Sequence, residues 1–122
     1  MSDRLLVIED NEQNLYLMRF LLEKNGFTVL GVTDGARAVA VALEWRPRAI
    51  LLDIQLPGMD GYAVAAALKE QAELAGVPII AVTSHAMAGD RQRILAAGAG
   101  GYIEKPIDPT TFVEEIRRHL AG

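Results

Sequence analysis

Four short apolar runs in this chain are each followed at once by polar side chains that can do chemistry. The polar residues are Glu9 and Asp10 after 5–8, Asp53 after 50–52, Thr83 and Ser84 after 79–82, and Glu104 and Lys105 after 101–103. Apolar runs this short, bounded by turn residues, are typical of parallel strands buried on both faces. Because open α/β sheets place their ligands at the carboxyl ends of the strands, we expect these side chains to form one site.

Three carboxylates meeting at that edge would need a cation. At an effective dielectric constant of about 20, two like charges about 4 Å apart repel by about 4 kcal/mol. Glu9, Asp10 and Asp53 offer only oxygen ligands, and no neighbouring cysteine or histidine adds a softer ligand. Such a set favours a hard ion, so we predict Mg²⁺, with Mn²⁺ as a substitute.

The same edge carries groups suited to holding a phosphoryl group. The Lys105 ammonium is a compact charge on a long stem, and the Thr83 hydroxyl can donate a hydrogen bond to a phosphoryl oxygen. A carboxylate beside Mg²⁺ and a lysine is a competent nucleophile for in-line phosphoryl transfer. The pattern therefore predicts an aspartyl-phosphate on Asp53.

The elements that must position these residues alternate regularly along the chain. We expect strands at 5–8, 27–32, 49–52, 77–82 and 101–103. Each is followed by a helical pattern, and these patterns lie at about 12–24, 34–43, 60–75, 88–97 and 108–120. Alternation of this kind predicts an α/β fold with a mainly parallel sheet and helices on both faces. The mixed apolar pattern of 27–32 favours an edge position for that strand.

Local signals predict where several helices begin or end. Asp34, Asp60 and Asp108 are each placed to cap the start of a helix, and Pro109 suits a first helical position. Asn25-Gly26 is expected to end the first helix because glycine readily adopts a left-handed backbone.

Size and composition narrow the function classes. The chain has 122 residues, of which 51% are hydrophobic and 23% charged, with a net charge of −4 and no cysteine. We expect one domain spanning 1–122 with no output domain. The acidic balance argues against a nucleic-acid partner. No apolar run is long enough for a signal peptide or a membrane span, so no membrane association and a cytoplasmic location are expected.

With these motifs in place, the chain resembles the receiver domain of two-component response regulators over essentially its whole length. The resemblance rests on Glu9-Asp10, Asp53 with the segment 57–61 (Pro-Gly-Met-Asp-Gly), Thr83-Ser84 and Lys105-Pro106 in that order. It implies a flavodoxin-like (βα)5 fold, a doubly wound five-stranded parallel sheet of order 2-1-3-4-5.

The resemblance also assigns roles to individual residues. Asp53 would be the phosphoacceptor, and Glu9, Asp10, Asp53 and the main-chain carbonyl of Gln55 would hold Mg²⁺. The remaining roles are phosphoryl contacts for Thr83 and Lys105, a cis bond between Lys105 and Pro106, and a switch formed by Thr83 and Tyr102.

The finer likeness is to stand-alone receivers of cell-cycle or phosphorelay type, carried by 9–12 and 85–91. It implies a histidine kinase or histidine phosphotransfer protein as donor. It also implies a protein effector bound through the fourth helix, fifth strand and fifth helix, and a monomer or weak dimer. A receiver cut from a hybrid histidine kinase fits the same motifs.

Rivals from other classes are a haloacid-dehalogenase-type phosphatase, a constitutive interaction module and a flavin-binding protein. The phosphatase would need a second aspartate at position 55, which is glutamine. The flavin protein would need a Ser/Thr-rich phosphate-binding loop after the first strand, where residues 9–12 are Glu-Asp-Asn-Glu. The presence of all three acidic residues, Glu9, Asp10 and Asp53, argues against an interaction module that kept the fold but lost the phosphoryl chemistry.

Overall fold

Five parallel strands form the centre of the computed structural model, which describes residues 3–56, 59–84 and 88–121. The strands are β1 (Arg4–Ile8), β2 (Thr28–Val32), β3 (Ala49–Asp53), β6 (Ile79–Thr83) and β7 (Gly101–Glu104). Their spatial order is β2-β1-β3-β6-β7. Counted along the chain among these five, that is the predicted order 2-1-3-4-5, and β2 lies at the predicted edge.

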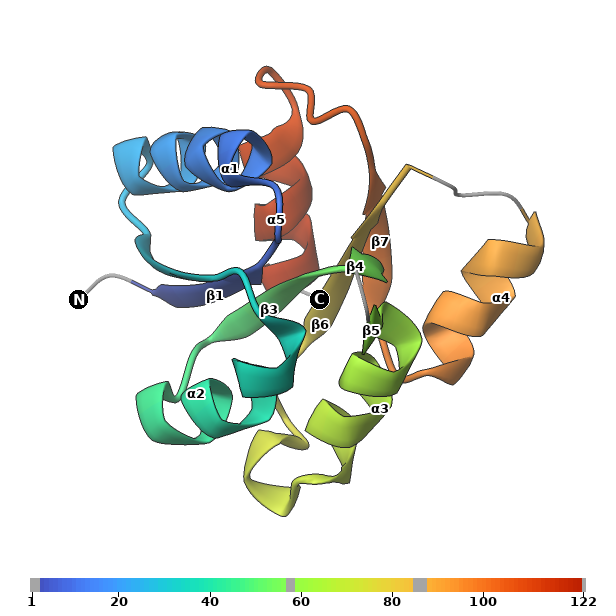
Figure 1. Cartoon of the computed structure of the whole chain (residues 1–122). Helices are drawn as coiled ribbons and strands as arrows, with labels where there is room; N and C mark the ends of the chain where they lie inside the picture. Colours follow the sequence, from blue (N-terminus) through green and yellow to red (C-terminus); the bar gives the residue numbers. More distant parts are fainter. Residues whose placement is uncertain (1–2, 57–58, 85–87, 122) are drawn as a thin grey trace.

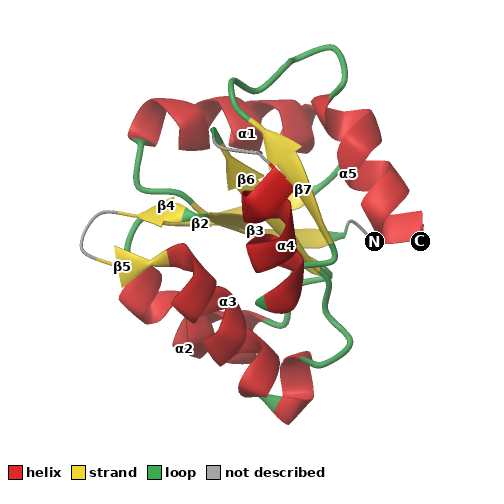
Figure 2. Ribbon diagram, turned by 90° about the vertical axis from the view of Figure 1, so that its right-hand side faces the viewer, coloured by secondary structure: helices red, strands yellow, loops and turns green. Residues whose placement is uncertain are grey.

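The helices cover both faces of this sheet (Figure 1). They are α1 (Glu12–Lys24), α2 (Ala38–Trp45), α3 (Gly61–Glu70), α4 (Ala88–Ala96) and α5 (Phe112–Ala121), with 3-10 turns at Gly35–Arg37 and Ala72–Leu74. In Figure 2, α1 and α5 lie together on one side of the strands, while α2, α3 and α4 lie on the other. The protein is therefore a three-layer α/β fold, as predicted.

Two apolar clusters join these layers, one on each face of the sheet. Side chains alternate along a strand, so Leu6 and Ile8 of β1 face α2 and α3, whereas Leu5 and Val7 face α1 and α5. The first cluster takes in Val64 and Leu68 of α3 and Ile94 of α4; the second takes in Met18 and Leu22 of α1 with Phe112 and Ile116 of α5. Burial on both faces explains why the central strands read as continuous apolar runs.

Three predicted helix boundaries differ from those in the structure, two of them because an aspartate caps a turn instead of the helix itself. Asp34 accepts from the backbone N–H of Ala36 and caps a 3-10 turn, so α2 begins only at Ala38. Asp108 accepts from Thr110, and α5 begins at Phe112 rather than at Pro109. The helix predicted to reach residue 75 ends at Glu70, because Gln71 has an extended backbone.

A small element that the sequence did not predict follows the central strand. Gln55–Leu56 (β4) and Met59–Asp60 (β5) pair antiparallel directly after β3. Asp60 then caps α3 through the N–H of Tyr62 at 2.9 Å, as predicted. Pro57 and Gly58 of the sequence motif lie outside the described residues, as do His85 and Met87. Among the described helices, none has the length and apolar character needed to cross a membrane.

Candidate phosphoryl-acceptor site

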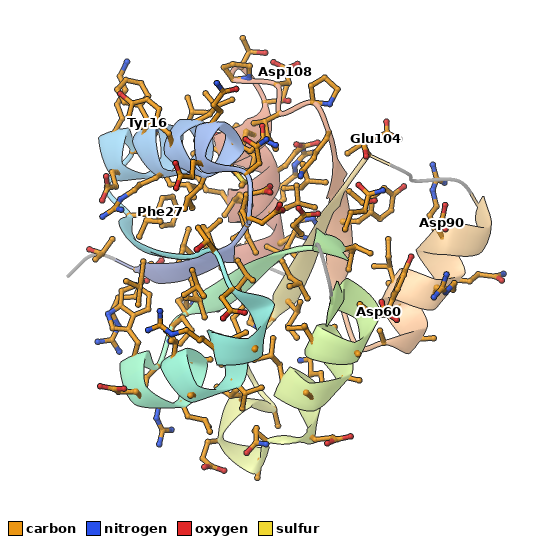
Figure 3. The ribbon with its side chains drawn as sticks, viewed as in Figure 1. Tyr16, Phe27, Asp60, Asp90, Glu104 and Asp108 are labelled. Carbon is orange, nitrogen blue, oxygen red and sulfur yellow. The ribbon has the colours of Figure 1, made fainter. Side chains whose placement is uncertain are left out.

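The carboxyl ends of four strands bring the predicted polar residues together. Asp53 is the last residue of β3 and pairs in register with Val82, one residue before Thr83. Glu9 directly follows β1, and its N–H donates to Val32 of β2 at 3.0 Å. Lys105 directly follows β7, and its N–H donates to the Thr83 carbonyl at 2.8 Å. The parallel register thus places the ends of β1, β3, β6 and β7 side by side, and Figure 3 shows Glu104 at that end of β7.

The three predicted acidic residues converge. Glu9, Asp10 and Asp53 each offer a carboxylate oxygen, and these oxygens lie within 4.8 Å of one another. Glu9 is fully buried, Asp53 is 3% exposed and Asp10 is half-buried. The prediction that these carboxylates would meet is confirmed in geometry.

Lys105 reaches across this group. Its Nζ lies 2.8 Å from Glu9 Oε1 and 3.2 Å from Asp53 Oδ2. Its side chain is only 15% exposed. The peptide bond between Lys105 and Pro106 is cis. The ammonium therefore contacts the residue predicted to accept a phosphoryl group, and its own contact with such a group stays a prediction.

Burial and charge shift the ionisation of this cluster. Burial, together with the adjacent Asp53 carboxylate, raises the pKa of Glu9 from 4.5 to about 7, although Lys105 acts in the opposite direction. Burial alone would lower the pKa of Lys105, but the hydrogen bond and charge of Glu9, with the charge of Asp53, raise it above its ordinary value. The positive charge of Lys105 is therefore not enough to offset the burial and mutual repulsion of the Glu9 and Asp53 carboxylates.

The burial and the donor chemistry of the three carboxylates suit a cation. Glu9 and Asp53 are buried, and Lys105 brings one positive charge to the three carboxylates, 2.8 Å from Glu9 Oε1 and 3.2 Å from Asp53 Oδ2. Buried carboxylates without matching positive charge are costly, so a second cation would stabilise the cluster. Together with the oxygen-only donor set, this fits Mg²⁺. That the Gln55 main-chain carbonyl is a further ligand of such an ion stays a prediction.

Asp53 is held by its own loop. Its Oδ1 accepts from the Gln55 N–H at 2.8 Å. The Gln55 side chain in turn accepts from the Ser84 hydroxyl at 2.7 Å, which links the loops after β3 and β6. The sequence predicted a role for the Gln55 carbonyl but not this side-chain hydrogen bond. No signal within the sequence could have paired two residues 29 positions apart.

Thr83 and Tyr102, the predicted switch pair, lie on neighbouring strands. Thr83 is 2% exposed at the end of β6, and Tyr102 of β7 is half-buried and pairs in register with Ala81. The guanidinium of Arg91 lies 5.3 Å from the centre of the Tyr102 ring. The switch role stays a prediction. The structure places Thr83 directly after Val82, the register partner of Asp53, and Tyr102 beside Arg91 of α4.

Comparison with known proteins identifies the family of this chain. Residues 5–117 match the family model for the response regulator receiver domain. The chain is 42% identical over 120 residues to the polar-differentiation response regulator DivK of Brucella anthropi, covering 98% of each chain. DivK of Brucella ovis matches at the same identity and coverage.

Solved structures give the same result. The receiver domain of the sensor histidine kinase PA1611 from Pseudomonas aeruginosa, solved with a magnesium ion in its active site cleft, superposes with a TM-score of 0.90. It is 34% identical, and the match covers all of both chains. The chemotaxis protein CheY4 of Vibrio cholerae has a TM-score of 0.92 at 26% identity, with 97% of this chain and 98% of that chain covered. On its sequence, fold and acidic site, this chain belongs to the response regulator receiver domain family.

Proposed function

We propose that this protein is a phosphorylation-controlled switch that accepts a phosphoryl group on Asp53. The observation that carries the proposal is the Lys105 ammonium, which contacts Asp53 at 3.2 Å within a cluster of three converging carboxylates. A nucleophile, an acidic site for a hard cation and a fixed positive charge are the parts that phosphoryl transfer requires.

In this reaction one Asp53 carboxylate oxygen attacks the phosphorus atom of a phosphohistidine. The new bond is oxygen to phosphorus, and the phosphorus–nitrogen bond of the donor breaks, returning its electron pair to the imidazole. Lys105 meets the negative charge on the phosphoryl oxygens, and the Thr83 hydroxyl donates to one of them. The Gln55 N–H donates to Asp53 Oδ1, whereas Lys105 contacts Oδ2, so the two residues together keep the carboxylate oriented.

Glu9, Asp10 and Asp53 would hold Mg²⁺, with the Gln55 carbonyl as a further ligand. The ion would offset the charge of both the nucleophile and the incoming phosphate. Water would later hydrolyse the acyl phosphate, so the protein would act on itself, as a switch, rather than turn over a separate substrate. A cytoplasmic location is part of the proposal, and a sequence without cysteine fits that reducing compartment.

A histidine kinase or histidine phosphotransfer protein is the proposed donor. The 42% identity to DivK over 98% of that protein supports a stand-alone regulator with a single receiver domain. The 34% identity to the receiver of the PA1611 kinase supports the alternative, a receiver excised from a hybrid kinase.

The proposed output face consists of α4, β7 and α5, which are the fourth helix, fifth strand and fifth helix of the fold. A protein effector would bind through 91–97 and 102–105. Leu95 supports this assignment because this α4 residue is 56% exposed, so it adds apolar surface to the face. Tyr102 and Arg91 lie on the same face.

The phosphatase alternative has less support. That class needs a second acid two residues after its nucleophile. Here the position is Gln55, and its side chain accepts a hydrogen bond from Ser84 instead of facing a leaving group.

Intact mass spectrometry tests the proposed function. Wild-type protein incubated with acetyl phosphate and Mg²⁺ should gain the mass of one phosphoryl group. Asp53→Asn under the same conditions, and wild type with excess chelator, should gain nothing. An adduct of unchanged yield in Asp53→Asn would reject Asp53 as the acceptor.

A further inference from the structure

Helix α4 has few apolar contacts with the protein. Among its described side chains, Ile94 is fully buried, whereas Arg91, Arg93 and Leu95 are exposed. Just beyond the helix, the chain turns through Gly98 with a φ of +105°. A helix with so little buried surface lies at the low-stability end of a structure, where weak surface contacts can decide its position.

Two arginines of α4 each contact a tyrosine on a different neighbouring element. The guanidinium of Arg93 lies 4.1 Å from the centre of the Tyr62 ring on α3, and that of Arg91 lies 5.3 Å from the Tyr102 ring on β7. Residues two apart point to roughly opposite sides of a helix. Both rings are half-buried against the apolar cluster that contains Ile94. Helix α4 thus contacts both α3 and β7, and in Figure 1 it lies on the outside of these two elements.

Tyr62 is joined to Asp53 by a short series of hydrogen bonds and one strand pairing. Asp53 accepts from the Gln55 N–H, and Gln55 pairs in register with Asp60 of β5. Asp60 caps the N–H of Tyr62, and the intervening Gly61 donates to the Ile54 carbonyl at 3.2 Å. A Cβ at Gly61 would collide with the Ile54 backbone, so only glycine fits the close approach of α3 to the residue after Asp53. Figure 3 labels Asp60 at the start of α3 and Asp90 on α4, the two helices that the arginine–tyrosine contact joins.

We propose that Arg93 and Tyr62 form a pin between α3 and α4 that opposes the displacement of α4 and so sets how readily the protein switches. The inference rests on the proposed function, since it assumes that phosphoryl acceptance at Asp53 moves α4. In this structure the Asp53 carboxylate is engaged by Lys105, and the pin is closed. The pin acts from the α3 side and is therefore separate from the Thr83–Tyr102 pair on β6 and β7.

The size of the effect follows from the nature of the contact. A cation–π pair at an exposed site changes an equilibrium by about two- to five-fold. A bound phosphoryl analogue favours the displaced α4, so opening the pin should raise the apparent affinity for that analogue by the same factor. The test compares Arg93→Met, Tyr62→Leu and the double variant. Tyr62→Phe keeps the ring, and Arg118→Met removes an exposed arginine elsewhere.

The first measurement is amide hydrogen exchange of the protein alone. Arg93→Met and Tyr62→Leu should each speed exchange at 94–97 by about two- to five-fold, and the double variant should add little to either. Tyr62→Phe and Arg118→Met should match wild type. Equal exchange in wild type and Arg93→Met would overturn the pin, provided that circular dichroism shows both folded.

The second measurement is a beryllofluoride titration in the presence of Mg²⁺, with the NMR shift of the Tyr102 amide as the readout. Arg93→Met should bind about two- to five-fold more tightly than wild type, although it removes a positive charge and electrostatics alone would weaken anion binding. Unchanged or weaker binding in both Arg93→Met and Tyr62→Leu would overturn the regulatory role. Failure of folded wild type to bind beryllofluoride would instead reject the proposed function, and the regulatory role with it.

Discussion

Lys105 Nζ lies 2.8 Å from Glu9 Oε1, and the two side chains are 15% and 1% exposed. This ion pair joins the residue after β1 to the residue after β7, two strands that are not neighbours in the sheet. It crosses the carboxyl edge of the sheet over the ends of β3 and β6, which carry Asp53 and Thr83. The pair therefore links the predicted metal ligands directly to the predicted phosphoryl contact.

Without divalent cations, the stability of the protein should fall as the pH rises from about 5 to about 8. In the unfolded chain Glu9 ionises near its ordinary pKa of 4.5, but burial raises that pKa to about 7 in the folded protein. Between these values the native state binds a proton that the unfolded state does not, so its Glu9-linked stability is present below 4.5 and is lost as the pH passes 7. Thermal melts in chelator across this range should show the decline for wild type. A parallel decline in Glu9→Gln would assign it to other groups.

Mg²⁺ should raise the melting temperature, because it binds the native site and not the unfolded chain. At one hundred times its Kd a ligand stabilises by about 2.7 kcal/mol. Asp10→Asn and Asp53→Asn should each raise the melting temperature of the metal-free protein by relieving repulsion, and should flatten the response to Mg²⁺. Differential scanning calorimetry with and without Mg²⁺ measures both effects. Identical titrations in wild type and both variants would mean that no metal is held here.

Lys105→Ala should impair switching more than metal binding. Lys105 contacts Glu9 and Asp53 but supplies no metal ligand, so its loss leaves the three carboxylates in place. Calorimetric Mg²⁺ affinity should be kept or increased, whereas beryllofluoride-induced NMR shifts in β7 should shrink. A loss of Mg²⁺ affinity as large as that in Asp10→Asn would contradict this division of roles.

Gly61→Ala should destabilise the protein by about 1–3 kcal/mol, because the added methyl group would meet the Ile54 backbone in a packed turn. Gly76→Ala is the matched control, since a Cβ there has no atom within 4 Å. That variant should be neutral or stabilised by about 0.4–1 kcal/mol. Urea unfolding of the two variants beside wild type measures the difference. Equal stabilities would show that the turn after Asp53 can relax.

Beryllofluoride with Mg²⁺ should shift NMR signals at 91–97 and 102–105 as well as around Asp53. Thr83 turning toward the bound group would leave space for Tyr102 to move, and α4 would follow. Heteronuclear correlation spectra of wild type and Asp53→Asn provide the comparison. Shifts confined to the loops around Asp53 would leave α4 and β7 without a role in output.

Local sequence patterns were sufficient to predict most of the strands, the helices and the position of the acidic site. The apolar runs before Asp53 and Thr83 identify strands buried on both faces, and the spacing of Phe112 and Ile116 identifies the buried face of a helix. Strand ends in a parallel sheet share one edge, so the convergence of the acidic residues followed from their positions after those strands. These features depend on periodicity and on the order of elements, which the sequence carries directly.

Other features were decided only by tertiary structure. Asp108 has the same capping chemistry as Asp60, yet it caps a turn, because the packing of the next helix decides where that helix begins. The Gln55–Ser84 hydrogen bond and the Arg93–Tyr62 contact join residues about 30 positions apart. Their meeting depends on strand register and on the docking of α3 and α4, which no local periodicity records. The sequence alone determined which groups stand at the edge of the sheet; packing decided which of them touch.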